Sequence, residues 1–234
     1  MKKIKQIYEG KAKKLFTTEN EDIYIQEFKD DATAFDATKR GTIHGKGVVN
    51  NKISTKLFQL LEKEGVPTHF IEMLNDRDMA VKRVEIVPLE VTMRNIVAGG
   101  MAKLLGLEEG IILDEPVYEY HYKEDSLHDP LINNSHIKAL KLATDEELNT
   151  IKELSYKVND ALKEFFSQKN LDLVDFKLEF GRCKGKIILA DEISPDTCRL
   201  WEKGSKRKMD KDRFRRDLGN IEETYQEVLK IVLD

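Results

Sequence analysis

The chain has 234 residues, enough to bury a sizeable core either as one large domain or as two closely packed lobes. With 40% hydrophobic and 35% charged residues, its composition is that of an ordinary globular protein and excludes a chain dominated by disorder. The formal net charge of −4 disfavours a protein that coats nucleic acid, and no apolar run approaches the roughly 20 residues that span a bilayer.

The N-terminal residues carry charges without an apolar stretch behind them, which argues against a signal peptide. Cys183 and Cys198 lack Cys-x-x-Cys spacing, so the sequence indicates neither a zinc site nor a disulfide framework. We therefore expect free thiols in a cytoplasmic protein that binds neither membrane nor nucleic acid.

The first elements are predicted to be three short strands in an antiparallel meander, at residues 5–10, 12–18 and 22–28. From Lys46 the apolar residues follow the period of a helix that ends at Gly65. Residues 68–74 and 78–93 return to strand character.

A change of pattern around Pro88, at residues 82–92, marks the expected boundary between two lobes. We place a strand-rich, nucleotide-clamping lobe at residues 1–84 and a mixed lobe at residues 85–234. The predicted fold class is therefore α+β.

The second lobe is expected to begin with a short helix from Arg94 to Leu105, broken by Gly99 and Gly100. A loop-rich region follows, which includes residues 117–123 and 127–136. Regular secondary structure is expected again from residue 144.

Thr144 and Glu147 form a capping box at the start of a long amphipathic helix that ends near Asn170. Residues 173–181 and 187–193 then form a predicted hairpin, and a last amphipathic helix begins near Asp210.

One face of the predicted strand 173–181 carries three charged residues, Asp175, Lys177 and Glu179, while apolar residues alternate with them on the other face. A three-residue turn around Gly185 would place Glu179 almost opposite Asp191. Because like charges across strands destabilise a sheet, a Mg²⁺ ion between these carboxylates would compensate. A solvent-facing hairpin with hydrated charges is the alternative.

Other cations have candidate roles. Lys11 and Lys13 follow Gly10 and point the same way along a strand, so they can clasp a polyphosphate, although no Walker A motif occurs. Arg94 and Arg199 are candidates for bidentate recognition of phosphate or carboxylate. Surface charges are the alternative in each case.

The basic run at residues 203–216 is interrupted by aspartates and is not accompanied by a ladder of aromatic residues. This pattern favours the solvated start of a helix over a nucleic-acid patch. A few of its cations can still face an anionic small molecule.

Seven segments, in order along the chain, together resemble the SAICAR synthetase family. They are YEGKAKKLF at 8–16, GKGVVNNK at 45–52, IVPLEVTMRNIVAGG at 86–100, LHDP at 127–130, LVDFKLEFG at 173–181, ADEISPDTCRLW at 190–201 and MDKDRFRRDLG at 209–219. Their order and spacing are far more specific than any one segment, and they span essentially the whole chain.

The resemblance implies a carbon–nitrogen ligase of de novo purine biosynthesis. Such an enzyme joins carboxyaminoimidazole ribonucleotide (CAIR) to L-aspartate, uses ATP and Mg²⁺, and releases SAICAR, ADP and phosphate. It also implies two lobes that clamp ATP in the cleft between them, and a homodimer. ATP must activate the CAIR carboxylate, because its resonance-stabilised oxygen is a poor leaving group; the expected intermediate is an acyl phosphate.

The resemblance also assigns expected roles to residues. ATP would be bound by Lys11, Ala12, Lys13, Lys82 and Val84, with the backbone of residues 82–84 beside the adenine. CAIR would be bound by Arg94, Gly100, Asp129 and Arg199, and Mg²⁺ by Glu179 and Asp191. Asp175 would hydrogen-bond the ribose or base, and Lys177 would face the carboxyl being activated.

The chain departs from the family pattern at Gly100, where the family usually has serine, and we expect weaker CAIR binding for want of that hydroxyl. His44 also stands where other residues are commoner, so the role of the loop around Lys46 in aspartate recognition stays open. Another ATP-dependent ligase or phosphotransferase, and a non-catalytic nucleotide-binding module, are the alternative functions.

Overall fold

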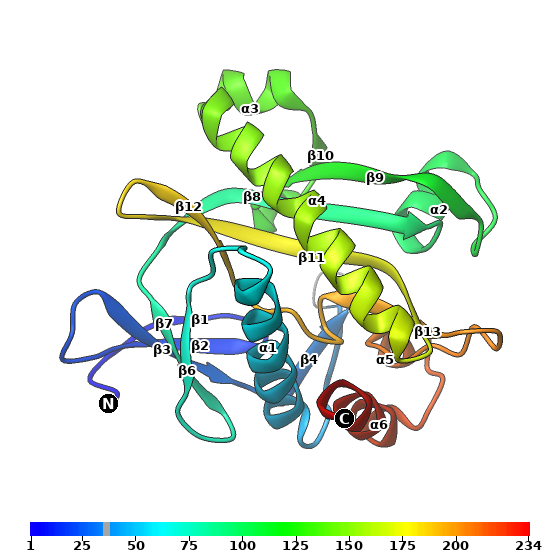
Figure 1. The fold of residues 1–234 in the computed structure, drawn as a ribbon, viewed down its shortest axis with the longest axis horizontal. Helices are drawn as coiled ribbons and strands as arrows, with labels where there is room; N and C mark the ends of the chain where they lie inside the picture. The colour runs from blue at the N-terminus through cyan, green and yellow to red at the C-terminus, as the bar shows by residue number, and fades with distance from the viewer. Residues whose placement is uncertain (35–37) are drawn as a thin grey trace.

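The computed structural model describes residues 1–34 and 38–234, and its N-terminal part is built on a five-stranded antiparallel sheet (Figure 1). In spatial order its strands are β1 (Gln6–Glu9), β2 (Lys13–Thr17), β3 (Ile23–Phe28), β7 (Asp78–Lys82) and β6 (Phe70–Met73). The predicted N-terminal meander is therefore confirmed. A separate two-stranded sheet pairs β4 (Asp31–Ala34) with β5 (Lys39–Thr42).

The second part is built on a six-stranded antiparallel sheet whose long strand β11 pairs with three others. The strands are β8 (Glu85–Ile96), β9 (Ile112–Tyr122), β10 (Leu131–Ile132), β11 (Leu171–Cys183), β12 (Lys186–Ala190) and β13 (Cys198–Glu202). The charged segment at residues 173–181 thus lies in the middle of this sheet.

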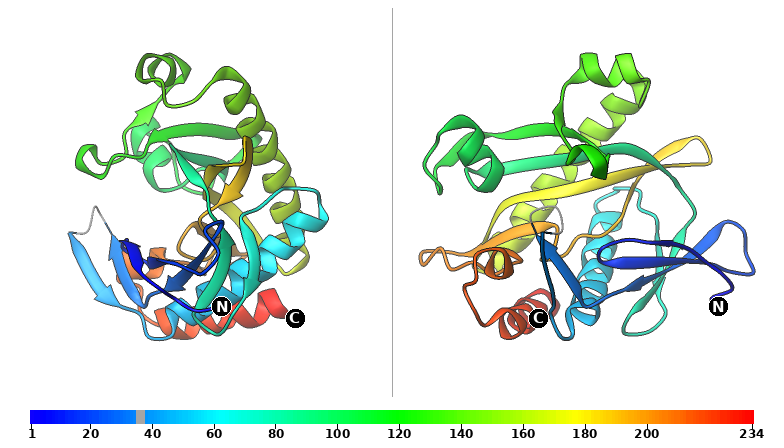
Figure 2. Two further views of the ribbon diagram at one scale, coloured as in Figure 1. Left: turned by 90° about the vertical axis from the view of Figure 1, so that its left-hand side faces the viewer. Right: turned by 180° about the vertical axis from the view of Figure 1, so that it is seen from behind.

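Two long helices cover the sheets, and a third packs beside them. The helices are α1 (Lys46–Lys63), α2 (Gly99–Leu105), α3 (Asn134–Leu140), α4 (Asp145–Gln168), α5 (Asp212–Arg215) and α6 (Ile221–Leu233), with a 3₁₀ turn at Asp125–Leu127. Figures 1 and 2 show α4 lying diagonally across β8 and β11, and α6 packed against α1. The predicted capping box of Thr144 and Glu147 does begin α4, which confirms that assignment.

One continuous apolar core joins the two parts of the chain. It includes Phe28 and Leu57 from the first part and Phe166, Phe180 and Val228 from the second, all essentially inaccessible to solvent. The chain passes from one sheet to the other between Lys82 and Glu85. The division into lobes at residue 84 stays a prediction.

Three predicted elements were wrong in detail. Residues 94–96 continue strand β8, and the helix begins only at Gly99, so the two glycines start α2 rather than break it. The region expected to be rich in loops instead contains the eleven-residue strand β9 and the helix α3. The aromatic and β-branched residues of β9 overrode the charges between them.

The last predicted helix is two helices: α5 ends at Arg215, and Asp217, Gly219 and Asn220, with positive φ angles of 54°, 68° and 50°, separate it from α6. Cys183 and Cys198 are both free, as expected. None of the helices in the described ranges, 1–34 and 38–234, is long and apolar enough to cross a membrane.

A partly exposed ion pair holds the start of α1. The N-cap of this helix, Gly45, offers no side chain, but the Asp30 carboxylate accepts hydrogen bonds from the N–H groups of Gly45 (3.3 Å) and Gly47 (2.9 Å). Arg77 donates to both oxygens of the same carboxylate, at 2.9 and 2.8 Å. Burial alone would raise the pKa of Asp30, but these donors outweigh it and lower the pKa to about 2.

Replacing Asp30 by Ala is expected to lower the free energy of unfolding by about 1–2 kcal/mol at neutral pH, because the N-terminus of α1 loses its cap. The folded pKa is below the ordinary value of 3.8, so this stabilisation is present above pH 4 and is lost as pH falls towards 2. Urea denaturation of both proteins from pH 7 to pH 2.5 measures the difference, which should shrink over that acid window.

The matched control is Asp76→Ala, since Asp76 is exposed and pairs only with Lys52 nearby. A difference between wild type and Asp30→Ala that stays constant with pH would contradict the assignment.

Candidate functional site

The site lies where one edge of β11 changes partner. Its C-terminal half pairs with β12 as far as Glu179, opposite Ala190, and its N-terminal half pairs with β13 from Phe176, opposite Cys198. Residues 191–197 form the loop between those two strands, and the Lys177 N–H donates to the Thr197 carbonyl at 2.9 Å. Lys177 is therefore the residue of β11 that faces the gap in the sheet edge.

The expected pairing of Glu179 with Asp191 was wrong by one residue. The hairpin turn has two residues, Lys184 and Gly185, both with positive φ, so Cys183 pairs with Lys186 and Glu179 with Ala190. Such a turn matches the twist of the two strands better than a three-residue loop does. Asp191 then leaves the strand with a φ of 64° and lines the same cavity as Glu179.

The like-charged pair across the strands is instead Glu179 with Glu90 of β8. Lys177 compensates for it, since its ammonium lies 2.9 Å from Glu90 Oε2 and 3.4 Å from Glu179 Oε1. Lys123 adds a second cation, 3.0 Å from Glu179 Oε1. Lysines therefore supply the positive charge that the sequence argument assigned to a metal ion.

Three adjoining cavities meet at this point, and Lys11, Thr33 and Lys177 line all of them. The first has a volume of about 550 Å³ and combines an apolar wall with charged residues. Its lining includes Ala12, Lys13, Leu15, Val81, Lys82, Val84, Ile86, Glu179 and Asp191. An apolar slot beside a cluster of charges suits a flat heterocycle that carries an anionic tail.

Two charged residues of this first cavity, Lys13 and Asp191, hold each other in their ionised forms. Lys13 contacts Asp191 directly and lies 3.0 Å from Glu192. Burial would lower the pKa of Lys13, but the two carboxylates outweigh it and raise that pKa. In return, burial would raise the pKa of Asp191, but Lys13 and Lys177 hold it at about 2. Near neutral pH both groups are charged.

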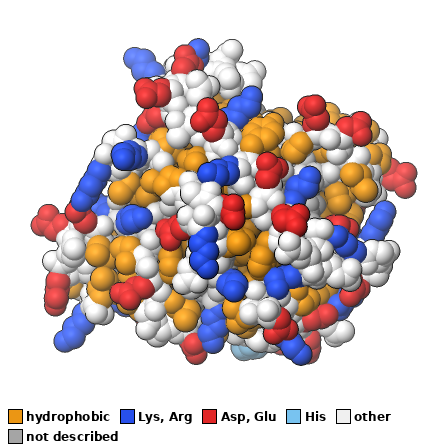
Figure 3. Space-filling model, viewed as in Figure 1, with side chains coloured by type: hydrophobic (Ala, Val, Ile, Leu, Met, Phe, Trp, Pro, Cys, Tyr) orange, Lys and Arg blue, Asp and Glu red, His pale blue; other side chains and the backbone are white. Residues whose placement is uncertain are grey.

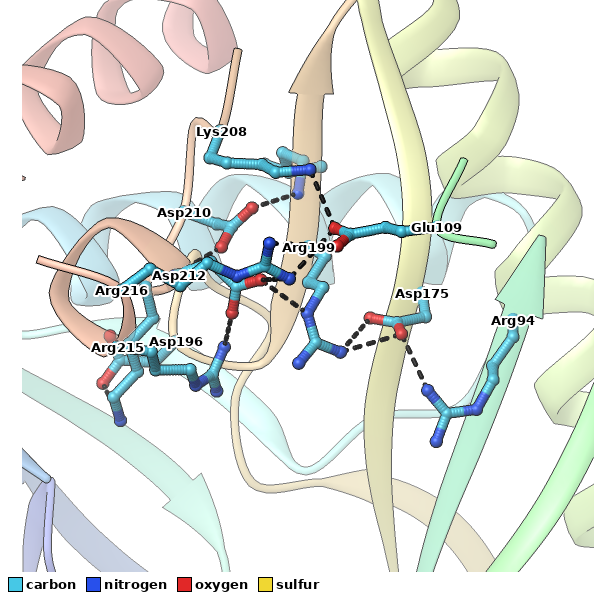
Figure 4. A network of polar contacts seen from close by, with 12 residues as sticks. Arg94, Glu109, Asp175, Asp196, Arg199, Lys208, Asp210, Asp212, Arg215 and Arg216 are labelled. Carbon is cyan, nitrogen blue, oxygen red and sulfur yellow. Dashed lines mark hydrogen bonds and ion pairs between the residues drawn. The ribbon is translucent and has the colours of Figure 1, made fainter. Parts of the chain in front are cut away.

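The second cavity, of about 370 Å³, is lined by arginines and by the predicted residues Gly100, Asp129 and Asp175. The sheet register explains its main feature, because Asp175 lies opposite Arg94 of β8 on one side and Arg199 of β13 on the other. Arg94 Nη1 donates to Asp175 at 2.8 Å, and Arg199 Nη1 donates to both Asp175 oxygens at 3.0 and 2.9 Å, as Figure 4 shows.

The guanidinium of Arg199 lies against the start of α2. A Cβ atom on Gly99 would come within 2.6 Å of Arg199 Nη2, and Gly99 also has a φ of 54°, so only glycine suits this position. Gly100 is different, because a Cβ there would meet no atom within 4 Å. The place of the family's usual serine is therefore open space on the wall of the arginine cavity.

The third cavity, of about 840 Å³, is lined by both acidic and basic side chains. It contains Lys11, Lys29, Arg40, Lys123 and Lys177 together with Glu9, Asp31, Glu90, Asp125 and Asp129. Its mixed charges suit a small molecule with both an amine and carboxylates.

All thirteen predicted site residues line at least one of these cavities, so the structure brings them together. Lys46 is not on a wall. Its side chain is fully buried behind the cavities and forms a 2.7 Å ion pair with Asp196, which itself lines the first two.

Several lining residues were missed by sequence reasoning. Lys123 and Thr33 belong to segments without a recognisable motif, and only the fold places them at the site. Lys211 and Arg215 belong to the basic run, for which a small-molecule contact was considered but no residue chosen. Their separation of four residues, on either side of Asp212, is the signal that was available.

The rest of the basic run is paired within the molecule. Arg207 binds Glu227, and both Lys208 and Arg216 bind Glu109. On the face drawn in Figure 3, basic and acidic side chains are interspersed rather than gathered by sign.

Within the described residues, no group of three or more His, Cys, Asp or Glu side chains is arranged to hold a metal ion. Glu179 and Asp191 each give one oxygen to a lysine, at Oε1 and Oδ1 respectively. A divalent ion at this pair would need further ligands from a substrate and from water.

Comparison with known proteins gives a consistent result. The family model described as SAICAR synthetase matches residues 6–232. A phosphoribosylaminoimidazole-succinocarboxamide synthase of Lachnoclostridium phytofermentans is 60% identical over 230 residues, which cover 98% of each chain.

Two solved structures are also similar. The crystal structure of the synthase of the same name from Ehrlichia chaffeensis has a TM-score of 0.96 and 45% identity, covering 97% of this chain and 98% of that one. A SAICAR synthetase in complex with ADP has a TM-score of 0.93 and 49% identity, covering 96% of each chain.

Proposed function

The chain belongs to the SAICAR synthetase family, and we propose that it joins CAIR to L-aspartate with ATP as co-substrate, releasing SAICAR, ADP and phosphate. It is a ligase of purine biosynthesis. The observation that carries the assignment of each substrate to a cavity is that three chemically different cavities meet, with Lys11, Thr33 and Lys177 lining all of them.

ATP occupies the 550 Å³ cavity in this proposal. Apolar side chains including Val84 and Ile86 face the adenine, and Lys11 and Lys13 face the phosphates. The N–H groups of Lys82 and Arg83 already donate to the carbonyls of His69 and Asp22, so the N–H of Val84 is the one left for the adenine edge. The similar protein with bound ADP supports a nucleotide site in this fold.

The two carboxylates of this cavity, Glu179 and Asp191, are suitable ligands for Mg²⁺. Glu179 Oε2 and Asp191 Oδ2 have no partner within the described part of the chain, and oxygen is the ligand that Mg²⁺ prefers. The two carboxylates would hold the ion together with phosphate oxygens, where it would neutralise charge on the phosphates. Lys13 and Lys123, which contact these carboxylates, line the same cavity and would also pair with those phosphates.

CAIR occupies the arginine cavity. Its 5′-phosphate binds Arg94 and Arg199, whose planar guanidinium groups match the anion, beside the N–H of Gly100. Asp175 holds both arginines and faces the same cavity, from where it accepts a hydrogen bond from the ribose or the base. Asp129 lines the wall towards the third cavity.

The chemical step takes place at Lys177. Its ammonium stays charged, because burial, which would lower its pKa, is outweighed by Glu179 and Glu90, which raise that pKa well above the ordinary value. In this position it brings the CAIR carboxylate and the γ-phosphate together, two anions that otherwise repel. The carboxylate oxygen attacks phosphorus and ADP leaves.

The resulting acyl phosphate is then attacked by the aspartate amine, which forms the C–N bond and expels phosphate. The 840 Å³ cavity is lined by the same lysine, and we assign it to L-aspartate.

We also propose that the protein is a cytoplasmic homodimer and that each chain has two lobes, divided at residue 84. It acts on small molecules and not on nucleic acid. The family resemblance supports these proposals.

ADP release by the purified protein should require both CAIR and L-aspartate, because the acyl phosphate is consumed only by the amine. A coupled ADP assay with each substrate omitted in turn tests this. Sustained ADP release without aspartate would point to a different acceptor, and a protein that binds ATP without turnover would be a binding module.

Glu179→Gln should lower kcat by about 100-fold or more, because the charge opposite the phosphates is removed while the side chain keeps its volume. The Mg²⁺ concentration for half-maximal rate should rise about tenfold or more. Titration of the initial rate with Mg²⁺ at saturating ATP measures both.

Glu72→Gln is the matched control, since Glu72 is exposed on the edge strand β6 and should leave both quantities unchanged. Normal kinetics for Glu179→Gln, with the control also normal, would rule out the metal assignment.

Gly100→Ser should bind CAIR more tightly than wild type, by about three- to tenfold, because the hydroxyl adds one hydrogen bond to the phosphate in space that is now open. Isothermal titration with CAIR measures the two affinities. Gly100→Ala fills the same space without a donor and serves as the control, and equal or weaker binding by Gly100→Ser would contradict the proposal.

A further inference from the structure

Five charged residues of alternating sign run behind the arginine cavity. The order is Arg94, Asp175, Arg199, Asp212 and Arg215, and the strands β8, β11 and β13 supply the first three. Only the last two come from α5. Figure 4 shows Asp175 and Asp212 on either side of the Arg199 guanidinium.

Asp212 is buried, with 1% of its surface exposed, and it holds two of these arginines at once. Its Oδ2 accepts from Arg199 Nε at 3.0 Å, and its Oδ1 accepts from Arg215 Nη1 at 2.7 Å. Because a guanidinium is planar, a bond at one edge fixes the direction of its other donors. Asp212 therefore sets how two arginines face the cavity.

Asp210 fixes Asp212 in turn. Its Oδ1 accepts from the Asp212 N–H at 2.6 Å, and its Oδ2 accepts from the N–H of Leu200 at 2.9 Å, next to Arg199 in β13. The start of α5 is thus tied to the strand that carries Arg199. The two hydrogen bonds to Asp210, rather than a flexible loop, therefore fix the position of Arg215 relative to Arg199.

The arginines keep donors for a ligand. Arg94 uses Nε for Glu119 and Nη1 for Asp175, and Arg199 uses Nε and Nη1 for the two aspartates. Within residues 1–34 and 38–234, the Nη2 atoms of Arg94, Arg199 and Arg215 make no hydrogen bond. All three side chains line the same 370 Å³ cavity.

We propose that Arg215 binds the 5′-phosphate of the ribonucleotide as the third arginine of this cavity, and that Asp212 is a positioning residue for Arg199 and Arg215. The inference rests on the proposed function, because it takes CAIR as the occupant. A phosphate dianion has three terminal oxygens. Three guanidinium groups, held on two strands and a helix, therefore match it better than two do.

Arg215→Gln should raise KM for CAIR by about 10- to 100-fold and leave KM for ATP unchanged, because a charge-assisted hydrogen bond to the phosphate is lost. The phosphate is tested directly with the nucleoside that lacks it. With this substrate, wild type and Arg215→Gln should have the same kcat/KM.

Arg216→Gln is the matched control. Arg216 follows directly in the chain and also lies near Asp212, but its guanidinium binds Glu109 and does not line the cavity. Its KM for CAIR should be that of wild type. Arg215→Lys keeps the charge and the ion pair with Asp212 but loses the fork, and its KM for CAIR should rise by a smaller factor.

Asp212→Asn should raise KM for CAIR about tenfold with little change in kcat, since it misdirects two arginines without touching the substrate. In the double variant with Arg215→Gln the two effects should be less than multiplicative, because Asp212 acts in part through Arg215. Fully multiplicative effects, or a fall in kcat alone, would overturn the positioning role.

An unchanged KM for CAIR in Arg215→Gln or Arg215→Lys would overturn the role of Arg215, as would an equal loss with the dephosphorylated nucleoside. The wild-type protein in the same assay separates this result from a failure of the proposed function. If wild type releases no ADP with CAIR and aspartate, the function itself is wrong; if it does, the outcome concerns Arg215 and Asp212 alone.

Discussion

The register of β11 is the constraint on which the site depends. Fixing Asp175 opposite Arg94 and Arg199 creates the anion-binding row, and the same register puts Glu179 opposite Glu90 and requires lysines nearby. A slip of one residue would turn every one of these side chains into the apolar core. The core residues that alternate with them, such as Phe176 and Phe180, prevent that slip, so packing on one face maintains the chemistry on the other.

Most of the charges buried at the site have a partner of opposite sign, which offsets part of their desolvation cost. Asp175 lies between two arginines, and Lys13 contacts two carboxylates, so desolvation is offset pair by pair. The contacts between Lys13 and Asp191 also keep these two groups ionised near neutral pH. A substrate anion or a metal ion then exchanges partners with existing ion pairs, and needs no new charge to be created in the interior.

Sequence patterns predicted the elements whose signals are local. The capping box of Thr144 marked the start of α4, and the apolar alternation of residues 173–181 gave the correct faces of β11. The turn at Lys184 was misjudged by one residue, because loop length depends on strand twist, which no single segment encodes. Residue type and spacing made Lys11, Arg94 and Glu179 candidates, and the resemblance assigned them to ATP, CAIR and Mg²⁺. Lys123 and Arg215 were missed because only tertiary structure brings them to the cavities.

Asp196 connects distant parts of the chain at the wall of the site. It accepts a hydrogen bond from Tyr225 of α6 at 2.6 Å and pairs with Lys46 at the beginning of α1, while lining the cavities assigned to ATP and CAIR. The helix α6 also packs against α1, so Asp196 joins the wall of the site to two packed helices. A change that loosens the packing of α6 should therefore reach the wall of the site through Asp196, although no residue of α6 is among those that line the three cavities.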